Sequence, residues 1–343
     1  MQFHIKNKSV VKLNRCLLLL LCLSMLFFTG SWGFLVHRTV HQVSVYQLPK
    51  QMQRFFYKNI DYLVQHSVRP DLRRNADSTE APKHFIDLEA FGDSAAWKMP
   101  PGWNEAIAKY SADSLEKYGY VPYWIVTMKE KLTNAFRSGN RDSILFYAAD
   151  IGHYIEDANV PLHTSINYDG QLTGQRGLHA LWESTIPELE INHYNLYSSH
   201  KAIYLPDPAQ AIWAAIRRAY ILLPDVFQQE KEASRLFTDS TKFNVQMRNG
   251  RQVKRYSSAF AREYSKRLGT TINQQLLRSA NLCADFWYTS WVDAGKPDLN
   301  VLLQSTFSKA DKKKLKKEIK AYRRNQLLKQ KHLIATKFKE ENF

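Results

Sequence analysis

Apolar side chains recur every three or four residues along most of the 343-residue chain, which is the periodicity of helices with one buried face. Proline and glycine separate these stretches, and the sequence shows no sustained strand-like alternation and no internal repeat. The pattern predicts helices over residues 36–59, 122–137, 142–158, 178–186, 206–229 and 257–292. Residues 64–101 and 160–177 are irregular, and long ordered loops in a compact domain are usually functional. We therefore predict an all-α fold.

The first 31 residues have the pattern of a signal peptide. Four basic residues precede an apolar run over residues 17–28, and small residues follow at Thr29 and Ser31. The apolar run would make a helix about 18 Å long, shorter than the roughly 30 Å hydrocarbon core of a bilayer. We predict cleavage before Trp32 and export to the periplasm or the medium. An uncleaved signal anchor is the alternative.

The formal net charge of +16 is concentrated at the two ends of the chain. Residues 1–31 carry four basic residues and no acid, and residues 308–343 carry 13 Lys/Arg against 4 Asp/Glu. Residues 32–307, which we predict to form a single domain, are therefore nearly balanced, and the total charge does not indicate a nucleic-acid-binding protein. The basic tail over residues 308–343 is predicted to be a solvated, helical or frayed segment. Loose attraction to anionic surfaces is the alternative interpretation.

The densest chemical signal is a set of histidines and carboxylates in the middle of the chain. His153 and Asp157 are four residues apart on a predicted helix, so both side chains project from one face, as two ligands of one metal ion require. Pro161 ends that helix, and His163 follows on a turn. His179 and Glu183 repeat the four-residue spacing on a second helix. Two such pairs within about thirty residues indicate a metal centre.

These motifs, with Trp32-Gly33-Phe34-Leu35-Val36-His37 and His84-Phe85-Ile86-Asp87, resemble the zinc-dependent phospholipases C of bacteria and the related zinc-dependent single-strand nucleases of fungi and plants. The resemblance covers residues 32–187 and implies a multi-helix domain with three zinc ions. It implies that the first ion is held by Asp71, His84, His153 and Asp157. The second would be held by His163, His179 and Glu183. The third would be held by the amino nitrogen and carbonyl of Trp32, by His37 and by a second oxygen of Asp157.

The same resemblance implies hydrolysis of phosphoester bonds by attack of a metal-bound hydroxide on phosphorus. Asp157 would bridge two ions, and Asp71 would orient or deprotonate the attacking water. Phe85 would stack against the substrate and Asp87 would hydrogen bond to it. For these last two residues, a core aromatic and an acid that orients His84 are equally acceptable interpretations.

Two ligand positions have a competitor nearby in the sequence. His41 lies four residues after His37 and shares its predicted helical face, but the distance of His37 from Trp32 matches the nuclease pattern better. Asp77 lies in the same irregular stretch as Asp71, but the Arg69-Pro70-Asp71 setting favours Asp71.

The sequence leaves the substrate open between two anionic phosphodiesters. The spacing from Trp32 to His37 resembles the nucleases, whereas Glu183 in the last ligand position resembles the phospholipases. A nuclease or broad phosphodiesterase is slightly favoured, and a phospholipase C acting on lipid headgroups is the alternative. A second alternative is a non-catalytic, zinc-bearing binding protein of the cell envelope. No obligate protein partner is evident.

Overall fold

The structure is a computed structural model that describes residues 34–248 and 251–338. The predicted signal peptide and Trp32 lie outside the described residues. The first group of elements is α2 (Phe34–Gln47), α3 (Lys50–Lys58), α4 (Ile60–His66), α5 (Arg69–Arg73), η1 (Ala81–Lys83), η2 (Leu88–Phe91), α6 (Ala95–Lys98), α7 (Trp103–Tyr110) and α8 (Ala112–Tyr118). The second is α9 (Val121–Arg137), α10 (Arg141–Asp157), η3 (Pro161–Thr164), α11 (Leu178–Ala180), η4 (Leu181–Thr185), α12 (Ile186–Glu190) and η5 (Ile191–His193). The third is α13 (Pro208–Ser234), α14 (Asp239–Lys242), β1 (Phe243–Arg248), β2 (Arg251–Tyr256), α15 (Ser258–Leu268), α16 (Thr271–Asp293), η6 (Leu299–Leu302), α17 (Lys309–Arg323) and η7 (Ile334–Lys337).

The predicted all-α fold is confirmed, and the helix boundaries follow local chemistry. At the start of α10 the Asn140 side chain accepts a hydrogen bond from the backbone of Ser143, which satisfies a free N–H of the first turn. Two predicted helices are each divided in two. Pro49 separates α2 from α3, and Gly269, with a φ of +59°, separates α15 from α16.

A two-stranded antiparallel hairpin, β1 and β2, is the one sheet within the described residues. The sequence analysis did not predict these two strands. Phe243 and Tyr256 pair at the base of the hairpin with ring centroids 5.0 Å apart, while Val245 and Met247 of β1 are exposed. Because the apolar side chains of β1 do not form a buried face, the sequence lacks the alternation of buried and polar residues that identifies strands.

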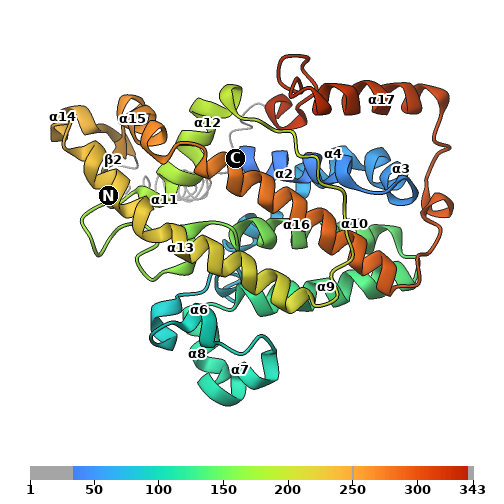
Figure 1. Cartoon of the computed structure of the whole chain (residues 1–343), viewed down its shortest axis with the longest axis horizontal. Coiled ribbons are helices and arrows are strands. Elements are labelled where there is room, and N and C mark those ends of the chain that lie inside the picture. The colour runs from blue at the N-terminus through green and yellow to red at the C-terminus, as the bar shows by residue number, and fades with distance from the viewer. Residues whose placement is uncertain (1–33, 249–250, 339–343) are drawn as a thin grey trace, which may run out of the picture.

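Helices α2, α9, α10 and α16 pack together around the larger of two apolar clusters, and Figure 1 shows α16 and α10 crossing the middle of the molecule. Helices α2 and α10 approach closely at Gly152, where an added Cβ would lie 2.4 Å from His41 Nε2. The smaller cluster is formed by α13, α15 and the segment that carries η3 and η4. The segment from α10 to η4 thus passes from one cluster to the other.

The basic segment near the C-terminal end forms helix α17, which lies along one edge of the molecule in Figure 1. Its Leu315 and Tyr322 are buried in the larger cluster. Over residues 34–248 and 251–338, no helix has both the length and the apolar character that a membrane crossing requires.

Candidate metal centre

Eight of the predicted ligands come together in space, although they belong to five separate stretches of the chain. Three groups have ligand atoms that all lie within 4.8 Å of one another and could hold a metal ion. These groups are His37 with His153 and Asp157, Asp71 with His84 and His153, and His163 with His179 and Glu183. Most of these side chains are buried, and Asp71, His179 and Glu183 are partly exposed. The ninth predicted ligand, Trp32, lies outside the described residues.

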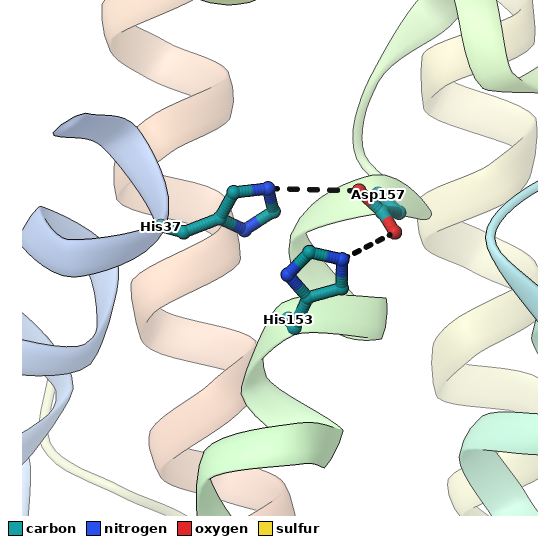
Figure 2. Close-up of side chains that lie close together, drawn as sticks. All are labelled: His37, His153 and Asp157. Atoms are coloured by element: carbon teal, nitrogen blue, oxygen red, sulfur yellow. Dashed lines mark ion pairs between the residues drawn. The ribbon is translucent and has the colours of Figure 1, made fainter. Parts of the chain in front are cut away.

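Asp157, the last residue of α10, occupies the middle of the cluster. Its Oδ2 lies 2.9 Å from His84 Nδ1 and 3.3 Å from His153 Nε2. Its Oδ1 faces the other side, 3.9 Å from His37 Nε2 and 3.8 Å from His163 Nδ1. Figure 2 shows the rings of His37, from α2, and His153, from α10, directed at this carboxylate. The two oxygens therefore face different groups of histidines, as a bridging carboxylate requires.

The third group forms where η3 meets α11 and η4. His163 Nε2 lies 2.8 Å from His179 Nε2 and 2.9 Å from Glu183 Oε1, which is itself 3.2 Å from His179 Nε2. Glu183 Oε1 is buried and makes no hydrogen bond of good geometry. Two ring nitrogens and a carboxylate oxygen thus converge on one point, which is a donor set that suits zinc.

The outer nitrogens of four histidines face protein oxygens and leave the inner nitrogens for a ligand. The outer nitrogens of His153 and His163 donate to the carbonyl oxygens of Ser67 (2.8 Å) and His84 (2.7 Å). The outer nitrogen of His37 contacts the Glu156 carboxylate, and that of His84 lies 3.6 Å from Glu80 Oε1. The hydrogen bonds of His153 and His163 fix the orientation and tautomer of these two rings, as is usual for metal-binding histidines.

The pKa values in the cluster show which groups need a counter-charge. Burial lowers the pKa of His153, but the carboxylates of Asp157 and Asp71 outweigh this effect and raise the pKa to about 9. Burial likewise lowers the pKa of His163, and Glu183 and Asp157 raise it to about 10. For His37, burial and neighbouring His153 lower the pKa to about 4. Two of the rings would therefore hold protons at neutral pH, and a divalent cation could supply the same positive charge.

The structure separates the predicted ligands from their competitors. Asp71 Oδ1 lies 3.7 Å from His84 Nδ1, whereas Asp77 accepts hydrogen bonds from the backbone and hydroxyl of Thr79. Both ring nitrogens of His41 lie 2.8 Å from backbone carbonyl oxygens, those of His37 and Ala149. Since neither of its nitrogens faces the cluster, His41 has the surroundings of a structural histidine.

The two residues expected to hold substrate lie beside the cluster. Asp87 is buried, and burial together with the nearby charge of Glu89 raises the pKa of its carboxyl to about 7. Phe85 is partly buried and packs against Gly119, where an added Cβ would come within 2.6 Å of the ring. Gly119 has a φ of +86° and leaves room for the Phe85 backbone and side chain.

Several charged residues around the cluster were missed by the sequence analysis. Glu156 contacts His37, and Glu80 pairs with Arg73 at 3.1 Å and also contacts the Tyr154 hydroxyl. Asp150, one helical turn before the ligand pair of α10, binds two arginines. Their positions in the sequence were the signal that could have identified two of them, since Glu80 lies four residues before His84 and Glu156 lies next to Asp157.

A small, solvent-open cleft borders the cluster. It lies between the first turn of α2, the end of α10, η4 and α16, and both Glu156 and Glu183 line it. The remaining lining includes Val36, Trp182 and Leu276. The cleft therefore combines acidic groups with apolar walls.

No protein-family model matches the sequence, and no curated protein matches it. Nine chains of solved structures match, among them an alpha toxin from Clostridium absonum, with a TM-score of 0.47 and 14% sequence identity. That match covers 79% of this chain and 65% of the toxin chain, so this chain spans less than two thirds of its length.

Proposed function

We propose that this chain is an exported, zinc-dependent hydrolase of phosphodiester bonds. The observation that carries the proposal is the convergence of three ligand groups around Asp157, with the outer ring nitrogens of four histidines facing protein oxygens. Histidine and carboxylate ligands in sets of three leave coordination positions open, which favours catalytic over structural zinc. Zinc held here would lower the pKa of water and stabilise charge on phosphoryl oxygens.

The protein groups around the ions would position and deprotonate the reactants. The Asp71 side chain is 28% exposed, whereas those of His84, His153 and Asp157 are at most 4% exposed. Asp71 is therefore the carboxylate of its group that an incoming water can reach from solvent. We assign to Asp71 the orientation of that water and the acceptance of its proton, and to Asp157 the bridging of two ions.

The rim of the site favours a lipid phosphodiester over a nucleic acid. The loop that joins His163 to His179 exposes Ile166, Tyr168 and Leu172, and the Tyr168 ring lies 6.0 Å from the His179 ring. Hydrogen bonds between Asn167 and Thr173 side chains and within the loop backbone hold this surface in place. The exposed aliphatic side chains Ile166 and Leu172 suit acyl chains, whereas the stacking of successive bases would need more aromatic rings than Tyr168. We therefore propose phospholipid headgroups as the substrate.

The first prediction is chelator-sensitive cleavage of phosphatidylcholine by the purified mature protein. Parallel assays use single-stranded DNA and a chromogenic phosphodiester, each with and without chelator and after zinc is restored. Headgroup release that exceeds nucleotide release supports the proposal. Nucleotide release without lipid cleavage would show that the protein is a nuclease and not a phospholipase. No chelator-sensitive hydrolysis of any substrate would favour the non-catalytic binding protein.

A second prediction concerns Glu156, which contacts the outer nitrogen of His37. Glu156→Ala removes the group that orients this ring, so we expect one metal ion to bind about 10–100-fold more weakly. Glu156→Gln retains an acceptor and should recover most of that affinity. Competitive zinc titration against a fluorescent chelator measures the difference, and Glu130→Ala, at a side chain that is 60% exposed, is the control. Equal affinity in Glu156→Ala and the native protein would exclude this role.

A further inference from the structure

Helix α17 carries a continuous cationic face that the metal centre does not use. Between residues 309 and 324, seven lysines and two arginines are all exposed. At about 100° per residue, seven of the eight cations within Lys309–Arg323 fall within an arc of roughly 140°. Within this helix the acids are Asp311 and Glu318, and both are engaged on other sides. Asp311 pairs with Lys58 at 2.9 Å, and Glu318 is buried and accepts a hydrogen bond from the Tyr46 hydroxyl.

This helix is fixed to the body of the protein. The Tyr322 hydroxyl donates to the Ser198 carbonyl at 3.0 Å, and its ring contacts those of Tyr46 and Tyr197 with centroid distances of 5.3 Å. The Ser308 side chain caps the first turn by accepting a hydrogen bond from the backbone of Asp311. The lysines therefore project from a rigid, docked helix, and their charges keep a fixed arrangement.

We propose that the exposed face of α17 binds the protein to anionic lipid surfaces. Most of its cations are lysines, which act as point charges suited to a diffuse negative surface, whereas arginine is the residue for bidentate phosphate recognition. Tyr322, the aromatic residue of α17, is buried, so the exposed face offers no platform on which bases could stack. The face also exposes no large apolar side chain, so the helix adsorbs without inserting. This inference does not rest on the proposed hydrolysis.

The test compares two triple variants with the same change in net charge. Lys313→Gln, Lys316→Gln and Lys320→Gln together neutralise the middle of the cationic face. Since each lysine near an anionic bilayer contributes about a factor of five in binding, partitioning onto phosphatidylglycerol-containing vesicles should fall on the order of 100-fold. The control combines Lys98→Gln, Lys201→Gln and Lys231→Gln, at exposed lysines outside α17, and should change partitioning by less than about fivefold.

Binding is measured on ice by vesicle sedimentation, with phosphatidylcholine vesicles and a single-stranded oligonucleotide as parallel probes. Salt should release the native protein from the anionic vesicles, because it screens the attraction between the exposed lysines and the lipid headgroups. Equal partitioning of the two triple variants, equal binding to neutral vesicles, or tighter binding to the oligonucleotide than to the anionic vesicles would each overturn the proposal. Hydrolysis of a soluble phosphodiester by the α17 variant should remain unchanged, so this result is independent of the outcome for the proposed function.

Discussion

Asp157→Asn is expected to remove more than one zinc ion from each chain and to lower hydrolysis roughly a thousandfold. The two carboxylate oxygens face different histidine nitrogens, with those of His84 and His153 on one side and that of His37 on the other. Asparagine keeps one oxygen but loses the negative charge and the second ligand atom, so both ions that share this side chain should be weakened. Metal content by mass spectrometry and hydrolysis of a chromogenic phosphodiester measure the two effects.

Asp142→Asn is the matched control for this prediction, because it makes the same substitution on the same helix. The Asp142 side chain is 87% exposed and lies in the first turn of α10, far along the helix from the ligand pair. Its metal content and activity should equal those of the native protein. Loss of a single ion from Asp157→Asn would contradict the bridging role, and an unchanged metal content would contradict the metal centre itself.

The helices with a strong apolar period could be predicted from the sequence to within a few residues. Predicted helices over 122–137 and 142–158 correspond to α9 (Val121–Arg137) and α10 (Arg141–Asp157). The prediction over 178–186 was less accurate, because that segment divides into α11, the π-helical turn η4 and α12. Periodicity detects a helical face but not a change in the hydrogen-bonding register within it.

The ligand pairs of the candidate site were visible because they obey local spacing. His153 with Asp157 and His179 with Glu183 lie on one helical face each, which the sequence alone reveals. Asp71 and His84 come from the irregular stretch, and only their resemblance to a known family placed them in the same group. The structure brings His84 Nδ1 within 3.2 Å of His153 Nε2 across 69 residues of sequence. No periodicity encodes such a long-range approach.

The supporting charges could not be predicted because their partners are distant and their burial depends on the whole fold. Asp150 appears in the sequence as one more polar residue of α10, yet it is 1% exposed. It is held by Arg69 and Arg73, which come from the segment around α5. Arg73 also pairs with Glu80, whose Oε1 lies 3.6 Å from His84 Nε2. The same irregular stretch therefore supplies Asp71 and His84 and anchors itself to α10.

Asp150→Ala is accordingly expected to destabilise the protein by about 3 kcal/mol. Asp150 accepts hydrogen bonds from Arg69 at 2.5 Å and from Arg73 at 2.8 Å, and its removal takes the shared carboxylate from two guanidinium groups. Arg69 keeps the Phe146 carbonyl and Arg73 keeps Glu80 as partners. We place the loss at the low end for a broken buried ion pair, because the arginine side chains are 19% and 29% exposed and retain some hydration. Urea unfolding measures the change.

The comparison variant for stability is Asp142→Ala. Asp142 pairs with Arg141 near the surface, so this variant should lower the free energy of unfolding by less than about 1 kcal/mol. A measurement of zinc affinity shows whether Asp150 only stabilises the fold or also holds the ligand-bearing segment in place. If Asp150 anchors the stretch that carries Asp71 and His84, Asp150→Ala should also weaken zinc binding under conditions where the variant is still folded. A destabilised variant with native zinc affinity would show that α5 is held to α10 independently of the metal centre. Native stability would show that water replaces the carboxylate without cost.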